Sequence, residues 1–192
     1  MDGTLGDPLR GQDIRHPDGQ YGTLAKWFHW LTVPLMAVAL STGPTIRFIK
    51  DEPKMAFYAV HESAGLLILA LALSRLLFRR FSPPPALPAH IPAAMRRAAA
   101  GVHHALYAAL VIQPVLGFLT TNAYGFPLRG ETAYLGFIDL PKFMDTNEPL
   151  ANALLAAHGW LGLGIVVLLV VHVGAVVFHQ AIRKDDTLLR MV

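Results

Sequence analysis

The fold of this chain is decided by residues 154–178, which read LLAAHGWLGLGIVVLLVVHVGAVVF. This stretch has no Asp, Glu, Lys or Arg, and it exceeds the roughly 20 residues that a helix needs to cross the apolar core of a bilayer. It holds His158 and His172, fourteen residues apart. That separation is about 21 Å along a helix and close to a whole number of turns. A helix of this sequence therefore presents two imidazoles on one face at two depths.

Three other apolar blocks precede this one, at residues 24–46, 58–78 and 102–122. The chain has 192 residues, of which 54% are hydrophobic and 15% charged. Four blocks of spanning length predict an all-α membrane protein, a bundle of four antiparallel transmembrane helices. A soluble four-helix bundle is the alternative, but it would show a polar stripe on every turn. Residues 66–73 and 165–171 show none.

The first 20 residues differ in composition from the rest. They are rich in glycine, aspartate and arginine, and we expect residues 1–20 to form a disordered cytoplasmic tail. Residues 21–192 are expected to form one four-helix transmembrane domain. We expect no cleavable signal peptide, because the chain stays polar up to Lys26 and the first apolar block is too long for one.

The distribution of basic residues predicts the orientation in the membrane. Loops that remain in the cytoplasm carry an excess of lysine and arginine. Eleven of the sixteen basic residues fall on one side of the expected bundle: Arg10, Arg15, Lys26, Arg75, Arg79, Arg80, Arg96, Arg97, Arg183, Lys184 and Arg190. We therefore expect both termini in the cytoplasm, with the chain crossing the membrane several times. A nucleic-acid partner is not expected, because these residues border apolar spans and form no basic domain.

The chain contains no cysteine. This excludes a covalently attached haem, a cysteine-ligated iron–sulfur cluster and a disulfide. A haem in this protein would be of the non-covalent b type with histidine ligands. Zinc suits stacked two-histidine sites poorly when cysteine is absent and carboxylates are few.

The expected topology assigns each histidine to one side of the membrane. His61 opens the second span and His158 opens the fourth, so both belong to the outer level. If a haem lies there with two histidine ligands, these two hold it. His29 and His172 are the preferred ligands at the inner level. His103 is the alternative inner ligand, or otherwise a hydrogen-bond donor to a haem propionate or a quinone. Two histidines on each iron would leave no open coordination site, which favours electron transfer over oxygen activation.

Two further polar residues are candidates for function. Arg75 follows His61 by fourteen residues and so points the same way near the inner level. It either binds a haem propionate or only reaches the lipid headgroups. His179 follows His172 by seven residues, near the inner surface. It either meets lipid headgroups or contributes to a quinone site, because ionisable groups in membrane helices usually mark functional pathways.

Several motifs resemble one known family. They are residues 28–30 (FHW), 61–65 (HESAG) with Arg75, 103–107 (HHALY) ahead of 113–117 (QPVLG), His158, His172 and 184–191 (KDDTLLRM). Over residues 20–192 the chain resembles the prokaryotic cytochrome b561 family, which is related to the cytochrome b subunits of nickel hydrogenases and formate dehydrogenases. The resemblance implies a multi-pass location in a bacterial inner membrane, four spans and two b-type haems, one held by His29 and His172 and the other by His61 and His158.

The resemblance also implies an activity. Members of the family similar to this chain include a superoxide:ubiquinone oxidoreductase, which takes electrons from superoxide at the outer face and reduces ubiquinone at the inner face. His179 matches the family position near the quinone, while Gln180 stands where a second histidine can follow. The alternative function is a non-enzymatic electron-transfer subunit that docks to a periplasmic dehydrogenase or cytochrome. A haem sensor or transporter would need a labile or five-coordinate haem, which two histidine pairs disfavour.

Overall fold

Four long helices dominate the computed structural model, which describes residues 19–50, 53–88, 90–126, 134–138 and 140–192. They are α1 (Thr23–Thr45), α2 (Pro53–Phe81), α3 (Ala93–Ala123) and α4 (Glu148–Val177), and a π-helical turn, η1 (Phe178–Arg183), continues α4. Each is long and apolar enough to cross a membrane. The prediction of an all-α chain with four apolar helices is therefore confirmed.

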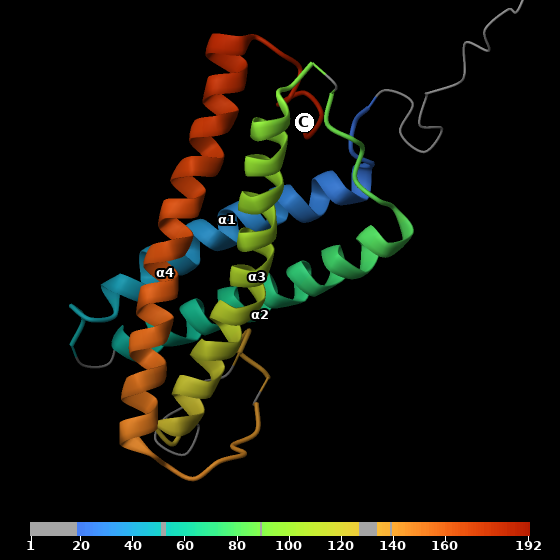
Figure 1. The fold of residues 1–192 in the computed structure, drawn as a ribbon. Coiled ribbons are helices and arrows are strands. Elements are labelled where there is room, and N and C mark those ends of the chain that lie inside the picture. The colour runs from blue at the N-terminus through green and yellow to red at the C-terminus, as the bar shows by residue number, and fades with distance from the viewer. Residues whose placement is uncertain (1–18, 51–52, 89, 127–133, 139) are drawn as a thin grey trace, which may run out of the picture.

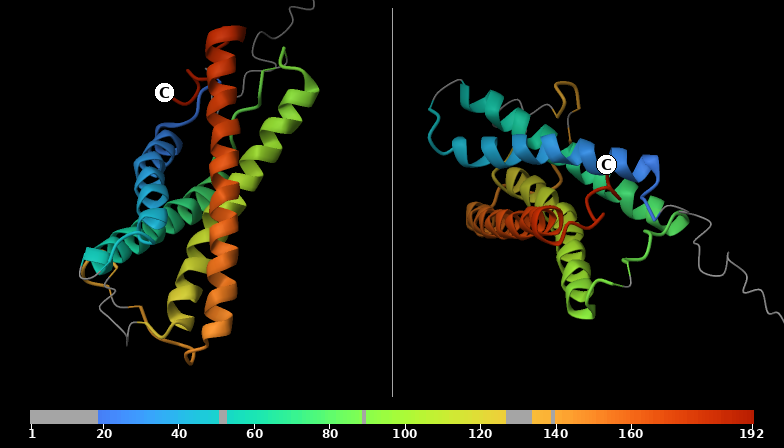
Figure 2. Two further views of the ribbon diagram at one scale, coloured as in Figure 1. Left: turned by 90° about the vertical axis from the view of Figure 1, so that its left-hand side faces the viewer. Right: turned by 90° about the horizontal axis from the view of Figure 1, so that it is seen from above.

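The helices are arranged as two hairpins. Helix α1 lies antiparallel to α2, and α3 lies antiparallel to α4 (Figure 1). The two hairpins cross one another, as the further views in Figure 2 also show. Each hairpin joins helices that are consecutive in the chain. Any site between the two hairpins is therefore built from residues of both halves of the sequence.

Each helix except α1 extends well beyond the apolar block that predicted it. Helix α2 runs from Pro53 to Phe81, and its last turn carries Arg79 and Arg80. Basic groups at a helix C-terminus interact favourably with the helix dipole, so the helix continues past the apolar residues. Helix α4 begins earlier than predicted because the Asn147 side chain accepts a hydrogen bond from the Leu150 amide and caps the helix.

Large apolar side chains cover the outside of the bundle. Helix α4 exposes many large apolar side chains, among them Leu163, Val167 and Val170, which are 53%, 56% and 67% exposed. No residue of α1 is buried. An apolar surface of this extent is unfavourable in water but is what lipid chains contact. The exposed surface therefore agrees with a bundle that lies in a bilayer.

The C-terminal segment, residues 184–192, folds back onto the start of α1 (Figure 1). Arg190 is buried, and its guanidinium donates hydrogen bonds to the carbonyl oxygens of Gly19, Pro85 and Ala86. The Trp30 indole donates to the carbonyl of Met191. This segment thereby ties together the chain before α1, the α2–α3 connection and the end of α4. Of the tail predicted over residues 1–20, residues 1–18 lie outside the described part.

The described part of the connection between α3 and α4 lies at the opposite end of the bundle. The Leu135 amide donates to Ser63 Oγ at 2.8 Å, two residues from His61 on α2. The Asn122 side chain accepts from the Phe143 amide and donates to the Pro141 carbonyl. These bonds place the described part of the connection beside the end of the bundle that carries His61.

Candidate functional site

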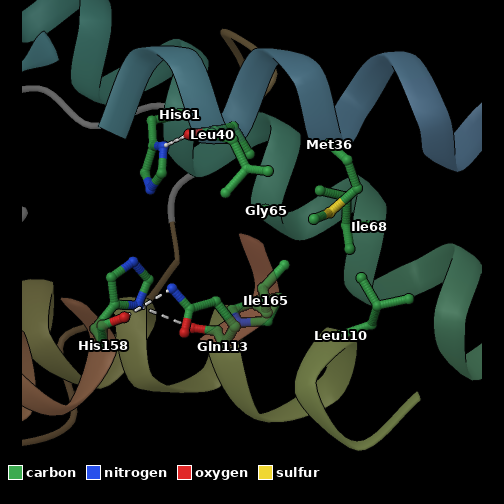
Figure 3. Close-up of a pocket in the computed structure, with 11 residues that line it drawn as sticks. Met36, Leu40, His61, Gly65, Ile68, Leu110, Gln113, His158 and Ile165 are labelled. Carbon is green, nitrogen blue, oxygen red and sulfur yellow. Dashed lines mark hydrogen bonds between the residues drawn. The ribbon is translucent and has the colours of Figure 1, made fainter. Parts of the chain in front are cut away.

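Two histidines from different hairpins face one another near the end of the bundle where the α3–α4 connection lies. His61 on α2 and His158 on α4 have ring centres 6.0 Å apart, with the ring planes at 75°. Figure 3 shows both rings beside one cavity, which is lined mainly by apolar side chains such as Met36, Ile68 and Ile165. The pair that the sequence assigns to the outer level is thus brought together at one cavity.

Each of these rings is oriented by a backbone carbonyl of the preceding helix. His61 Nδ1 lies 3.0 Å from the Ala39 carbonyl oxygen, and His158 Nδ1 lies 3.1 Å from the Gln113 carbonyl oxygen. A carbonyl only accepts hydrogen bonds, so Nδ1 must carry the hydrogen in both rings. The lone pair is then on Nε2. An imidazole in this tautomer can ligate a metal through Nε2.

A glycine lies against each ring. A Cβ atom on Gly43 would come within 2.8 Å of His61 Cε1, and one on Gly117 within 3.2 Å of His158 Cε1. Gly43 and Gly117 each follow the carbonyl that accepts from the same ring by four residues, which is about one helical turn. The two hairpins therefore repeat one local arrangement, in which a carbonyl and a glycine of the first helix hold the histidine of the second.

Gln113 binds His158 twice. Besides the carbonyl contact, its side-chain Nε2 donates to the His158 carbonyl oxygen at 3.0 Å. A Cβ on Gly162 would be 3.3 Å from the same nitrogen, so this glycine leaves room for the amide. Gln113 thus fixes both the backbone and the ring of His158 (Figure 3).

Three histidines meet at the inner level. His172 on α4 has its ring centre 6.3 Å from that of His29 on α1 and 5.4 Å from that of His103 on α3. The preferred ligand and its alternative are therefore both close to His172. Helix α4 contributes one histidine to each level, as the fourteen-residue spacing predicts.

The spacing of the pairs can be compared with that of two axial ligands. Two metal–nitrogen bonds of about 2 Å, with roughly 1 Å from each nitrogen to its ring centre, put two trans imidazole centres about 6 Å apart. The 6.0 Å of His61 and His158 and the 6.3 Å of His29 and His172 match this value. The 5.4 Å of His103 and His172 is shorter. Both pairs therefore have the ring separation expected of two imidazoles that share one metal ion.

Basic side chains surround the inner level. The guanidinium carbons of Arg75 and Arg79 lie 5.2 and 5.0 Å from the ring centre of Tyr107 on α3. Arg75 is also close enough to interact electrostatically with His29 and His172. The structure thus places Arg75 at the inner level, where its guanidinium suits a carboxylate such as a haem propionate.

His179 lies apart from these pairs, in η1, which follows the C-terminal end of α4. Its Nδ1 is 2.6 Å from Asp185 Oδ2. The ring is therefore held by a carboxylate of the C-terminal segment.

Three features of the site were not anticipated from the sequence. Gly43 and Gly117 are remote in sequence from the histidines that they contact, and contact across helices depends on packing. Gln113 was recognised only as part of a motif, although an amide inside an apolar span is a signal for a buried hydrogen bond. Glu62 accepts a hydrogen bond from Thr121 at 2.9 Å, and its other carboxylate oxygen is buried without a partner within the described residues.

Comparison with known proteins gives related sequences along almost the whole chain. The sequence profile described as prokaryotic cytochrome b561 matches residues 20–192. Cytochrome b561 homolog 2 of Escherichia coli (strain K12) is 32% identical over 176 residues, which are 90% of this chain and 91% of the relative. Cytochrome b561 homolog 1 of the same strain is 29% identical, covering 86% and 93%. A protein of Yersinia pestis named probable superoxide oxidase CybB is 27% identical, covering 90% and 96%.

Proposed function

Because the chain belongs to the prokaryotic cytochrome b561 family, we propose that it is a membrane cytochrome that binds two b-type haems and carries electrons from an outer donor to ubiquinone. The observation that carries this proposal is the spacing of the histidine pairs, 6.0 Å at one level and 6.3 Å at the other. Both pairs share α4, which is long and apolar enough to span the bilayer.

Four histidines hold the two cofactors in this proposal. His61 and His158 ligate the outer haem, and His29 and His172 ligate the inner one. Each bound haem supplies a reversible one-electron change. The Ala39 and Gln113 carbonyls hold Nδ1 of the two outer imidazoles, which would leave Nε2 free to ligate the iron. Arg75 and His103 lie around the inner pair, where they bind propionate or take a secondary role.

The proposed orientation places both termini in the cytoplasm of a bacterium, with the protein in the inner membrane. It follows from the excess of lysine and arginine on the side of the termini. The end of the bundle with His61 and His158 then faces the periplasm. The end with His179 and the C-terminal segment faces the cytoplasm, which supplies protons.

Superoxide is the donor that we propose. Two superoxide anions each give up one electron and leave as molecular oxygen, and one ubiquinone takes the two electrons and two cytoplasmic protons to form ubiquinol. The relative from Yersinia pestis that is named probable superoxide oxidase supports this choice. His179, at the inner end of α4, is the proposed quinone contact, because imidazole exchanges protons at physiological pH.

The test uses the protein purified in detergent. We expect about two haems per chain, low-spin spectra, and ubiquinone reduction driven by enzymatically generated superoxide. A matched His61→Ala/His158→Ala variant corrects for the spontaneous reaction. A rate no higher than in this variant would exclude superoxide as donor. Co-purification of a periplasmic redox protein that reduces the haems would favour the alternative, an electron-transfer subunit.

A further inference from the structure

Helix α4 changes its geometry where it reaches His179. Residues 178–183 form a π-helical turn, and Lys184 ends it in the left-handed backbone region with φ of 52°. π-Helical turns are rare and occur often at functional sites. The left-handed residue reverses the chain, and the Asp185 amide then donates to the His179 carbonyl oxygen. This reversal brings the Asp185 side chain back onto the His179 ring.

The Asp185 carboxylate is held by four donors. His179 Nδ1 and Arg183 Nε lie 2.6 and 3.2 Å from Oδ2. The Thr187 hydroxyl and amide lie 2.6 and 3.1 Å from Oδ1. Desolvation favours the neutral acid, but the hydrogen bonds from Thr187 and His179 outweigh it and hold the pKa of the Asp185 carboxyl below its usual range. An ionised carboxylate with both oxygens occupied therefore faces the imidazole.

This contact determines which ring nitrogen is available. An ionised carboxylate only accepts hydrogen bonds, so His179 Nδ1 carries a hydrogen. Within the described residues, the hydrogen bonds of this ring all involve Nδ1. Nε2 is left to exchange protons with another molecule. His179 itself is 9% exposed, whereas the neighbouring side chains of Phe178 and Ile182 are 38% and 71% exposed. A quinone would therefore reach the ring along these two apolar side chains.

We propose that Asp185 is a positioning residue that holds His179 with Nε2 directed to the quinone headgroup, so that the ring delivers protons as the quinone is reduced. This inference rests on the proposed function. The imidazolium gives the Nε2 proton to a reduced quinone oxygen, and Nδ1–H stays on Asp185. Nε2 then takes a proton from water at the inner face. Two such transfers accompany the two electrons that convert quinone to quinol.

The experiment separates this role from a purely structural one. Asp185→Asn keeps the size of the side chain but removes the charge, and an amide can turn to donate to Nδ1, which leaves the hydrogen on the wrong nitrogen. Asp186→Asn is the matched control, because Asp186 is the adjacent aspartate and is exposed. His179→Ala and the double variant complete a cycle. Haem content and thermal stability are measured for each variant, and Asp185→Glu tests rescue by a carboxylate.

We measure the reoxidation of the pre-reduced haems by a water-soluble ubiquinone over a range of quinone concentrations. Loss of a positioned proton donor lowers rates by about 10²–10⁴, and we expect Asp185→Asn to lower kcat at least about tenfold with little change in KM. Asp186→Asn should match the wild type, Asp185→Glu should recover part of the rate, and Asp185→Asn should add nothing in the His179→Ala background.

Three results would overturn the inference. Normal reoxidation in Asp185→Asn, with slow reoxidation in His179→Ala, would remove the role of Asp185 and leave His179 in the quinone site. Independent, additive losses in the double variant would show that Asp185 acts on the fold and not through His179. Unchanged reoxidation in His179→Ala would refute the proposed quinone contact itself. If Asp185→Asn fails to bind haem, Asp185→Glu is compared with His179→Ala instead. A normal rate in Asp185→Glu together with a slow rate in His179→Ala would support a carboxylate at this position acting through His179, and equally slow or equally normal rates in both would contradict it.

Discussion

The imidazoles of His61 and His158 belong to different helical hairpins, yet their ring centres lie 6.0 Å apart. Each ring is fixed by a carbonyl of the helix that precedes it in the chain. The first hairpin therefore positions one ligand and the second hairpin the other. A cofactor that binds both would join the two hairpins across the place where they cross.

The outer pair gives the first prediction. We expect His61→Ala and His158→Ala each to lose the outer haem and keep the inner one, because each variant removes one of two axial ligands. Haem content, measured as the pyridine complex, should fall from about two per chain to about one. His104 lies outside both pairs, so His104→Ala is the control. If this variant also lost one haem, haem loss could not be taken as evidence that a histidine is a ligand.

The inner level gives a prediction that distinguishes two ligands. We expect His29→Ala and His172→Ala to lose the inner haem and His103→Ala to retain it, because His29 lies 6.3 Å from His172 and His103 only 5.4 Å. Absorption spectra at low temperature would resolve the two haems. Two haems with unchanged spectra in His172→Ala would refute the pairing. Loss of haem in His103→Ala alone would make His103 the ligand.

Gly43 gives a prediction about packing. In Gly43→Ala the new methyl would lie 2.8 Å from His61 Cε1, so the ring must turn away from the Ala39 carbonyl. Overpacking of this kind costs about 1–3 kcal/mol, and we expect weaker haem binding at the outer level. Gly164→Ala is the control, since its methyl would meet no atom within 4 Å. Equal haem retention by both variants during gel filtration would show that the ring adjusts without cost.

The buried guanidinium of Arg190 gives a prediction about stability. Its three hydrogen bonds go to the carbonyls of Gly19, Pro85 and Ala86. The single ammonium nitrogen of a lysine cannot donate to all three carbonyls at once. Because a hydrogen bond to a charged group contributes about 1.5–3 kcal/mol, Arg190→Lys should lower the free energy of unfolding by about 2–5 kcal/mol. Thermal denaturation in detergent measures this, with the exposed Arg97→Lys as control. A Tm equal to that of the control would contradict it.

The lowered pKa of the Asp185 carboxyl leads to a prediction about how the stability of the fold depends on pH. Its pKa in the folded protein is lower than usual, whereas the pKa of an aspartate in an unfolded chain is about 3.9. The stability that the ionised carboxylate contributes is therefore fully present above about pH 5. It is lost as the pH falls below about 4 toward the folded pKa. The difference in Tm between wild type and Asp185→Asn should be constant from pH 7 to 5 and shrink in more acidic buffer. A difference that instead grows on acidification would reverse the sign of the pKa shift.

Much of the architecture could be predicted from the sequence because helical periodicity is local. Four apolar blocks of spanning length gave four apolar helices. The spacing of His158 and His172 placed one histidine at each level from α4 alone. The helix ends were less predictable: Asn147 caps α4 outside the apolar block, and Arg79 and Arg80 extend α2 beyond it.

The sequence by itself determined the number of apolar helices, the absence of cysteine and the placement of His158 and His172 at two levels of one helix, since these depend on composition and on residues within one helix. Only the tertiary structure decided that Gly43 lies against His61, that Gln113 holds His158 and that Asp185 returns onto His179. The first two contacts depend on the register of one helix against another. The third depends on the left-handed conformation of Lys184, which a lysine adopts only when its surroundings impose it.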